Sequence, residues 1–374
     1  MPRSGLRVLF VVPSGDYLPS GIVRVAQFVP FLERNGIAHR TLSYYSPQLD
    51  RLAAVVRGGE LVAILKSVSL ILIALGQVAF KWWARILMLW FAPRVDVVFL
   101  QGILPPVWHV RALRALNPYV VLDMDDAIFL GNPQRGAAVV SRMTQVIAGS
   151  HFIHDYASTH NDRVALVPSA VSLGRYGTRE SASCGTRVRI GWLGSTSTIK
   201  YLSHLIEPLT ALAAEGHDIE LHIDGIGNHE AALPKFPGVT VTSSPNYRDE
   251  DIPGIVAGYD VGVMPLDDGP WEQAKCAMKA LIYMAAGKPA VCSRVGENAY
   301  VIDDGVNGLL AGSAAEWTMK LRSVIADPGL RADLGRRGRK TVEDRYSTVV
   351  CFALLQQHVF ARAELQTVSP GMTS

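Results

Sequence analysis

The stretch that decides the fold is DVGVMPLDDGPWEQAKCAMKALIYMAAGKP, residues Asp260–Pro289. Its first residues, ending at Met264, form an apolar run that predicts a strand, and an acidic Gly/Pro loop follows it. We expect the helical pattern after the loop to carry Lys275 and Lys279 one turn apart on one face. Lysines at the start of a helix suit a diphosphate, while Glu272 or the loop backbone suits sugar hydroxyls. The alternative is an amphipathic helix with exposed lysines.

Apolar runs of the same kind lie on both sides of this stretch, separated by longer helical patterns. A polar, Gly/Ser-rich segment at residues 171–186 divides them into two series, as a linker would. The alternation predicts two doubly wound α/β domains, residues 1–170 and 171–349, followed by residues 350–374. The predicted strands are Val8–Val12, Val95–Leu100, Val120–Leu122, Val146–Ala148 and Ala165–Val167 in the first domain, and Val188–Leu193, Ile219–Ile223, Val239–Thr242, Val261–Met264 and Ala290–Cys292 in the second.

Composition excludes several classes of protein. The 374 residues are 49% hydrophobic and 18% charged, which allows sizeable cores and excludes disorder. A net charge of +3 is too small to predict nucleic-acid binding. The four cysteines are scattered without metal-ligand spacing, which favours a reducing compartment over a disulfide scaffold or zinc module. No signal peptide is expected, because only a short apolar run follows Arg3 and Arg7.

Residues 61–93 interrupt the pattern with a long apolar stretch, LVAILKSVSLILIALGQVAFKWWARILMLWFAP. Its longest uncharged run, Ser67–Phe80, has 14 residues, fewer than the roughly 20 that span a bilayer. On a helix its polar side chains fall within an arc of roughly 100°; they are Lys66, Ser67, Gln77, Lys81 and Arg85. A cationic strip beside a wide apolar face predicts helices in the membrane interface, inserted through Leu72, Trp82, Trp83 and Trp90. Buried core helices and a true span are the alternatives.

Two turns that follow predicted strands have the small residues of a phosphate-binding loop. GSTSTIK, residues Gly194–Lys200, precedes a helical pattern. Its backbone N–H groups, its hydroxyls and its final lysine are placed to contact an anion at the positive end of that helix. Ordinary N-capping by Ser197 or Thr198 is the alternative. Ser20-Gly21, after the first strand, is a weaker signal of the same type and is equally consistent with a simple glycine turn.

Three carboxylates, Asp123, Asp125 and Asp126, follow the predicted strand Val120–Leu122. Ligands of parallel sheets bind beyond the carboxyl ends of the strands, so these side chains are expected to face a ligand. They could supply a general base, orient an acceptor hydroxyl or hold a metal. A structural turn or cap is the alternative, and we assign no metal.

These segments resemble the retaining glycosyltransferases of family 4. IGWLGSTST with Lys200, YDVGVMPL, WEQAKCAMKALIYMAAGKPAVCSRVG, DDGVNGLLA and DRYS are similar to the family's donor-domain signatures. VIAGSHFI with LVPSAVSLGRY is similar to its interdomain stretch, so the similarity covers about residues 5–350. The resemblance implies a GT-B fold with two facing Rossmann-like domains, the second binding a nucleotide-sugar and the first an acceptor. It also implies that a last helix near residues 350–365 crosses back to the first domain.

The sequence departs from the family pattern at three places. The family's E-x7-E motif would put glutamates where Ala274 and Ile282 stand. Ser195 replaces the arginine of the phosphate loop, which leaves Lys200 as the basic contact. The acidic group that begins at Asp123 stands in place of the acceptor-side histidine. We interpret the changes as a modified donor site, in which Glu272 makes the sugar contact of the first family glutamate.

The resulting hypothesis is a cytoplasm-facing glycosyltransferase held peripherally on the inner face of the cell membrane. It would move a sugar, with retention, from a nucleotide-diphosphate-sugar to a hydroxyl of a lipid-linked or cell-envelope glycan. The expected partners are donor, acceptor and membrane surface, with no cofactor, metal or nucleic acid. An inactive glycan-binding or tethering member of the same fold and a nucleotide-sugar epimerase are the alternatives.

The residues assigned to this site form three sets. Catalysis is assigned to Asp125, Asp126, Lys200 and Glu272. Donor binding is assigned to Gly21, Gly194, Ser195, Thr196, Thr198, Lys200, Asp224, Glu272, Lys275 and Lys279. Acceptor binding is assigned to Asp123, Asp125 and Asp126.

Overall fold

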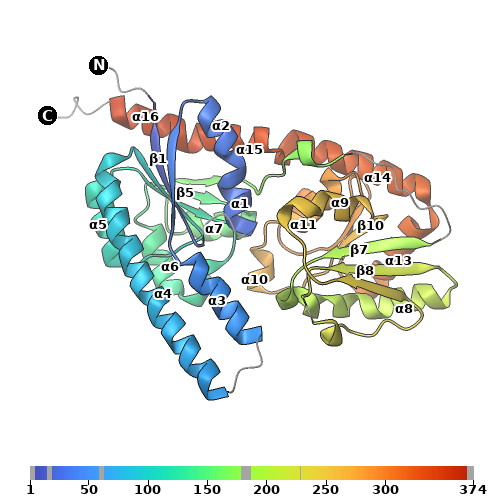
Figure 1. Cartoon of the computed structure of the whole chain (residues 1–374). Coiled ribbons are helices and arrows are strands. Elements are labelled where there is room, and N and C mark those ends of the chain that lie inside the picture. The colour runs from blue at the N-terminus through green and yellow to red at the C-terminus, as the bar shows by residue number, and fades with distance from the viewer. Residues whose placement is uncertain (1–4, 15–18, 59–62, 178–186, 228, 369–374) are drawn as a thin grey trace. The chain divides into compact units, whose positions relative to one another are not determined.

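The computed structural model describes residues 5–14, 19–58, 63–177, 187–227 and 229–368 (Figure 1). The chain forms two compact units. The first comprises residues 1–168 together with 352–374, and the second comprises residues 169–351.

The first unit is built on a six-stranded parallel sheet in the order β2-β1-β3-β4-β5-β6. Its strands are β1 Arg7–Val12, β2 Ala38–Ser43, β3 Val97–Gln101, β4 Val120–Met124, β5 Gln145–Ala148 and β6 Val164–Leu166. Its helices up to β6 are α1 Pro19–Arg24, α2 Val29–Arg34, α3 Pro47–Gly58, α4 Ala63–Phe91, α5 Val107–Leu116, α6 Pro133–Val140 and α7 His151–Ser158, with short 3-10 turns at Ala26–Phe28, Ala92–Arg94 and Ile128–Gly131. The apolar strands β3 and β4 are buried along their whole length, as central parallel strands must be.

The second unit repeats the plan with the order β12-β11-β10-β7-β8-β9. Its strands are β7 Val188–Leu193, β8 Ile219–Asp224, β9 Thr240–Ser244, β10 Val261–Met264, β11 Ala290–Ser293 and β12 Leu309–Ala311. Its main helices are η6 Thr196–Leu205, a 3-10 helix, and α8 Ile206–Ala214, α9 Ile252–Ala257, α10 Pro270–Gln273, α11 Met278–Ala285, α12 Asn298–Val301, α13 Ala314–Ala326 and α14 Pro328–Thr341. One apolar cluster of this unit contains α9 and α11, and the other contains η6, α8 and α13.

Two strands were not predicted from the sequence, and both lie at a sheet edge. β2 reads AHRTLS and is mostly exposed or half-buried, so it lacks the apolar run used to find its neighbours. β12 is fully buried but only three residues long. Both add on to strands with strong apolar runs, so tertiary pairing rather than local pattern defines them.

α4 is a single helix of 29 residues, where the apolar stretch suggested more than one helix. Residues 61 and 62 of that stretch lie outside the described residues. α4 runs beside α3, and the two share a small apolar cluster of Ala53, Val56 and Ile73 (Figure 1). Gly76 allows this approach, because a Cβ there would lie 2.9 Å from Leu49.

The C-terminal residues from Phe352 to Val368 belong to the first unit. Helix α15 spans Thr348–Leu355, a π-helical turn spans Gln356–Phe360, and α16 spans Ala361–Val368. The Phe352 ring lies 6.1 Å from Phe28 and 5.2 Å from Phe31, measured between ring centroids. Phe352 therefore anchors this segment to the helices that follow β1.

Two strand glycines of the second unit make room for buried tyrosine rings. A Cβ on Gly191 of β7 would lie 2.1 Å from the Tyr259 ring, and a Cβ on Gly262 of β10 would lie 2.2 Å from the Tyr283 ring. Both tyrosines are almost fully buried. The two glycines thus let aromatic side chains lie directly on the strands.

We expect Gly262→Ala to destabilise the protein by about 1–3 kcal/mol, because Tyr283 is enclosed and has no room to move away. The urea-unfolding midpoint measures this change. Gly174→Ala is the matched control, since a Cβ at Gly174 meets nothing within 4 Å. Equal midpoints for the two variants would contradict the packing argument.

Candidate functional site

The turn after β7 requires glycine. A Cβ on Gly194 would lie 2.0 Å from the ring of Trp192, which is itself fully buried. The Gly194 carbonyl accepts a hydrogen bond from the Tyr247 hydroxyl at 3.1 Å, and its N–H donates to the Asp224 carbonyl at 2.9 Å. The turn is therefore fixed in position at the carboxyl end of the sheet, where parallel sheets bind ligands.

Hydroxyl groups of this turn cap the helix η6. The side chain of Ser195, rather than Ser197 or Thr198, accepts from the backbone of Thr198, and the Ser195 N–H donates to Thr198 Oγ1 at 3.1 Å. The Thr196 hydroxyl donates to the Ile226 carbonyl at 3.1 Å. The capping alternative is thus present, and it leaves backbone N–H groups of the first turn as the polar groups for an anion.

Lys200 lies between two carboxylates. Its Nζ is 3.5 Å from Asp267 and 3.6 Å from Glu272, and it sits 4.7 Å from the centroid of the Tyr201 ring. Glu272 is buried and accepts a hydrogen bond from the Tyr201 hydroxyl. Asp267 also pairs with His204 at 2.7 Å, and this hydrogen bond is the main reason that the pKa of Asp267 is lowered.

The prediction that Lys275 and Lys279 share one helix face is wrong. α10 ends at Gln273 and α11 begins at Met278, so Lys275 lies between the two helices. Ala277 has a φ of 53°, in the left-handed region that side chains other than glycine rarely adopt. This strained residue breaks the helix that the apolar spacing predicted.

The break still leaves the two lysines close together. Lys279 Nζ lies 4.6 Å from the centroid of the Trp192 ring, and Lys275 Nζ lies 5.8 Å from that of Trp271. Burial, assisted by the charge of Lys275, lowers the pKa of Lys279 to about 7. Lys275 also donates its N–H to the Glu272 carbonyl at 3.2 Å. Lys200, Glu272, Lys275 and Lys279 therefore gather where η6 meets α10 and α11.

Other positions singled out in this unit are buried. Asp224, at the end of β8, is 1% exposed, accepts from the Tyr259 hydroxyl, and lies 3.4 Å from His222. Ala274 and Ile282, where the resemblance places glutamates, are also buried. The carboxylates of the family motif thus have no counterpart at these two positions.

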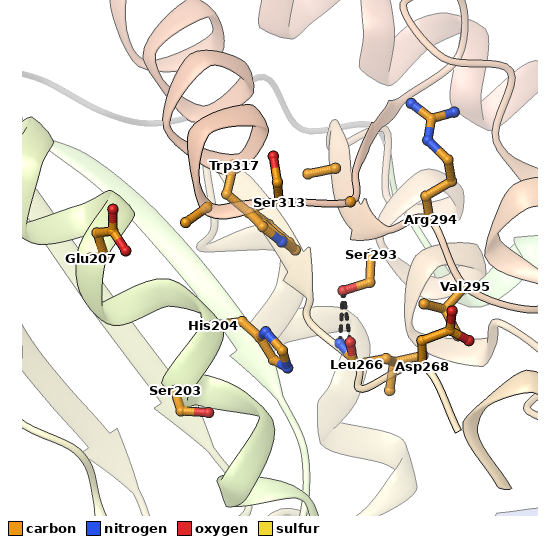
Figure 2. Close-up of a pocket in the computed structure, with 13 residues that line it drawn as sticks. Ser203, His204, Glu207, Leu266, Asp268, Ser293, Arg294, Val295, Ser313 and Trp317 are labelled. Carbon is orange, nitrogen blue, oxygen red and sulfur yellow. Dashed lines mark hydrogen bonds between the residues drawn. The ribbon is translucent and has the colours of Figure 1, made fainter. Parts of the chain in front are cut away.

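A cavity of about 440 Å³ lies beyond the ends of β10, β11 and β12 (Figure 2). The hydroxyl of Ser293 there bonds both the N–H and the carbonyl of Leu266, and Trp317 of α13 closes one side. His204, which pairs with Asp267, also lines it. The sequence reading missed these residues, whose available signal was their position directly after predicted strands.

In the first unit, Asp123 forms a buried ion pair. Arg24 donates to its carboxylate through Nε at 3.0 Å and through Nη2, and both side chains are at most 3% exposed. Arg24 also donates to the Val167 carbonyl at 2.8 Å. Asp123 thus connects α1 with β4, and its acceptor capacity is directed into the protein rather than towards a ligand.

Asp125 and Asp126 are half-buried at the end of β4. The Gln101 side chain donates to Asp125 at 3.1 Å, and Gly102 approaches Asp125 closely enough that a Cβ there would lie 3.8 Å from its carboxylate. Burial, assisted by the charge of Asp123 and opposed by that of Arg24, raises the pKa of Asp125 to about 7. Asp125 therefore changes charge near neutral pH.

Gly21 is the one residue of the predicted donor set that belongs to the first unit, where it is buried in α1. The remaining donor residues all belong to the second unit. Among the described residues, no group of three or more His, Cys, Asp or Glu side chains is arranged to hold a metal ion.

α4 exposes an apolar face and turns Gln77, Lys81 and Arg85 of its polar strip towards neighbouring segments. Leu72, Trp82, Trp83 and Trp90 are each at least half exposed, and so are several aliphatic residues of the same face. Gln77, from the polar strip, donates to the Ser46 carbonyl at 3.0 Å and to Asp50 at 2.8 Å. By length and hydropathy Leu65–Arg94 could cross a membrane, which alone is weak evidence. A core helix would show the opposite orientation.

Residues 187–327 match the family model described as Glycosyl transferases group 1. This segment contains the turn after β7, Lys275 and Lys279, so the match to glycosyltransferases group 1 includes these predicted donor residues. A 205-residue part of the chain is 27% identical to D-inositol 3-phosphate glycosyltransferase of Arthrobacter sp. (strain FB24). That match covers 50% of this chain and 46% of the relative, about half of each protein.

Two solved structures are similar over nearly the whole chain. HepE (Alr3699) of Anabaena, in complex with UDP and glucose, aligns with 98% of this chain and 100% of its own, at a TM-score of 0.63 and 14% identity. Sucrose-phosphate synthase from Thermosynechococcus elongatus aligns with 97% and 100%, at a TM-score of 0.66 and 16% identity. At these identities the likeness concerns the fold, and it confirms the predicted GT-B class.

We expect Asp125→Asn to stabilise the protein at pH 8 by an amount of order 2 kcal/mol and to change stability little near pH 4. The folded state keeps the Asp125 proton up to about pH 7, whereas an ordinary aspartate loses it near its model value of 3.8. Stability from this group is therefore lost as the pH rises through that window, and asparagine removes the loss.

Melting temperatures measured from pH 4 to 8 test this expectation. Asp162→Asn is the control, because Asp162 is an exposed aspartate of the same unit. A constant difference between Asp125→Asn and the unmodified protein at every pH would contradict the raised pKa.

Proposed function

We propose that the chain is a membrane-associated retaining glycosyltransferase. It transfers a sugar from a nucleotide-diphosphate-sugar to a hydroxyl of a lipid-linked or cell-envelope glycan. The observation that carries the proposal is the gathering of Lys200, Lys275 and Lys279 at the carboxyl end of the second sheet. This gathering lies inside the segment that matches the glycosyltransferase family model.

The cations suit the leaving group of such a transfer. When the bond between the sugar and the diphosphate breaks, negative charge grows on the diphosphate, and fixed positive charges stabilise it. The N–H groups at the start of η6 add partial positive charge at the same place. HepE, which shares the fold, was solved with UDP and glucose, and this supports a nucleoside diphosphate as the ligand class.

Glu272 is the residue we assign to the transferred sugar. It is buried, and the Tyr201 hydroxyl and Lys200 hold its carboxylate. A carboxylate fixed in this way can accept hydrogen bonds from sugar hydroxyls without moving. It lies in α10, the short helix that follows the loop after β10.

We assign Asp125 and Asp126 to the acceptor. The ionised Asp125 accepts a hydrogen bond from the acceptor hydroxyl and orients its oxygen towards the anomeric carbon. The new bond forms as the bond to the diphosphate breaks, and the hydroxyl proton passes to a leaving phosphate oxygen. Arg24 and Asp123 act behind Asp125 as positioning residues, because their ion pair fixes the end of β4.

Membrane attachment is assigned to the apolar face of α4. Exposed aliphatic and tryptophan side chains cover it, and residues 63–95 contain no acidic residue. Tryptophans and cations flanking an apolar face are typical of helices that lie in a membrane interface. Attachment to the inner face of the cell membrane would bring the protein to lipid-linked glycans there.

We expect one nucleoside diphosphate among UDP, GDP and ADP to raise the melting temperature of the purified protein. A ligand at 100 times its dissociation constant adds about 2.7 kcal/mol of stability. Lys200→Ala and Lys275→Ala should each reduce the shift strongly, whereas Lys235→Ala, an exposed lysine of the same unit, should leave it unchanged. A thermal-shift series measures all three.

The same thermal-shift series also tests the alternative functions. If no nucleotide stabilises the protein, an inactive glycan-binding or tethering role becomes the better conclusion. Ala274 and Ile282, which stand where the family has glutamates and are buried, would agree with that outcome. If nucleotide binds but purified protein transfers no sugar to extracted lipid-linked glycans, the assignment of the acceptor is wrong.

We expect the double variant Leu72→Glu, Trp83→Glu to lose vesicle binding by at least about tenfold, because each side chain would otherwise bury apolar surface in lipid. Flotation with lipid vesicles measures the bound fraction. The control is Val349→Glu with Leu365→Glu, which changes two exposed apolar residues outside α4. Vesicle binding that survives in the α4 variant would show that another surface holds the membrane.

A further inference from the structure

The inward side of α4 brings two cations to the end of strand β2. Arg85 donates through Nε to the Tyr44 hydroxyl at 2.9 Å, and Lys81 Nζ lies 5.1 Å from the centroid of the Tyr45 ring. The two tyrosines directly follow β2, which ends at Ser43. α4 therefore presents its positive charge at the carboxyl edge of the first sheet, on the side opposite its exposed apolar face.

A third cation joins them from another helix. Arg135 is an exposed residue of α6. Burial raises the pKa of Tyr45, and the charges of Arg85 and Arg135 oppose that shift, so Arg135 adds to the positive potential at the Tyr45 phenol. Lys81, Arg85 and Arg135, around Tyr44 and Tyr45, are here called the edge cluster.

The positive charge of the edge cluster is not neutralised within the described part of the chain. None of its three cations has a described carboxylate within 4.0 Å. Asp50 is the acidic residue that acts on Tyr45, and its two oxygens already accept from Ser14 at 3.0 Å and from Gln77 at 2.8 Å. Aromatic rings and the Tyr44 phenol contact Lys81 and Arg85 instead, and these contacts leave the positive charge available to an anion.

The edge cluster is connected to the assigned acceptor carboxylate along the sheet edge. The Tyr45 N–H donates to the Pro13 carbonyl at 2.7 Å, and Pro13 lies against Gly102, which in turn approaches Asp125. These residues end β2, β1, β3 and β4, which are neighbours in that order. Three strand spacings separate Tyr45 from Asp125, roughly 15 Å along the edge.

We propose that the edge cluster binds the diphosphate group that joins an acceptor glycan to its lipid. The proposal rests on the proposed function, because it names the class of acceptor for the same reaction. The opposite face of α4 would lie in the bilayer, so the cluster would stand at the level of the lipid headgroups. From there the glycan extends along the sheet edge towards Asp125.

Charge favours a diphosphate over the phosphate of an ordinary phospholipid. Three uncompensated cations match the two or more negative charges of a diphosphate, whereas a phosphodiester carries one. The Tyr44 hydroxyl, which accepts from Arg85, keeps its own O–H to donate to a phosphate oxygen. Basic residues at a membrane surface also attract anionic lipids in general, so the experiment must separate the two sources of phosphate.

Vesicle flotation of the full-length chain makes that separation. Phosphatidylcholine vesicles are prepared with a small fraction of a polyprenyl diphosphate, with the uncharged polyprenol, or with phosphatidylglycerol at equal total charge. We expect the diphosphate to raise binding at least fivefold over polyprenol and well above phosphatidylglycerol. Equal binding to diphosphate and phosphatidylglycerol vesicles would overturn the proposal, and so would no vesicle binding at all.

Variants of the three cations test whether the edge cluster causes the increase in vesicle binding. The triple variant Lys81→Gln, Arg85→Gln, Arg135→Gln should bind phosphatidylcholine vesicles like the unmodified chain. It should lose the increase in binding that the diphosphate gives, here called the diphosphate gain. Arg135→Gln alone, at an exposed position, should at least halve the gain even if the triple variant folds poorly. Arg34→Gln is the control, because Arg34 is an exposed arginine that likewise lies over an aromatic ring, that of Phe31. A gain that persists in both cluster variants would overturn the proposal.

This outcome is independent of the donor site. Nucleotide stabilisation depends on Lys200 and Lys275 in the second unit, whereas the edge cluster lies in the first. Nucleotide binding without a diphosphate gain would overturn the present inference alone. A diphosphate gain without nucleotide stabilisation would support it and count against the transferase.

Discussion

The buried hydroxyl of Tyr283 holds together the two strands on which the proposed donor site depends. It accepts from the Leu193 N–H at 3.0 Å and donates to the Val263 carbonyl at 3.2 Å, so it bridges the ends of β7 and β10. Gly262 makes this possible, because any side chain there would meet the Tyr283 ring. The turn at Gly194 and the loop that leads to Glu272 begin directly after those strand ends. Tyr283 and Gly262 therefore help to fix the distance between the lysines and Glu272, the proposed sugar-binding carboxylate.

In the first unit, a buried ion pair rather than a tyrosine hydroxyl holds the end of a strand in place. The Arg24–Asp123 pair is fully enclosed, and breaking such a pair leaves an uncompensated charge that costs several kcal/mol. The pair fixes α1 against β4. Burial, assisted by the charge of Asp123 and opposed by that of Arg24, raises the pKa of the nearby Asp125 to about 7, a property that would suit its proposed contact with a hydroxyl. A structural role for Asp123 and the proposed chemical role for Asp125 thus fall to two aspartates that stand two positions apart.

Sequence reasoning succeeded where burial alone determines structure. The apolar runs of central strands such as β3, β7 and β10 predicted their positions to within a residue or two, and the small residues after β7 predicted the turn. It failed where neighbours override local preference. Alanine is the best helix former, yet Ala277 adopts a left-handed conformation that ends the predicted helix. The polar edge strand β2 has no apolar run, and periodicity shows that α4 has two faces without showing which one faces the sheet.

The replacement of the family glutamates has a consistent electrostatic explanation. Ala274 and Ile282 are buried and uncharged, so they offer no carboxylate to Lys275 and Lys279, which repel each other. Burial holds the pKa of Lys279 near 7, so part of that repulsion is relieved by loss of a proton when no anion is present. A diphosphate would reverse the balance, because its charge favours the protonated lysine and its binding would take up a proton. The two lysines thus lack a counter-charge, which the diphosphate of the proposed donor would supply.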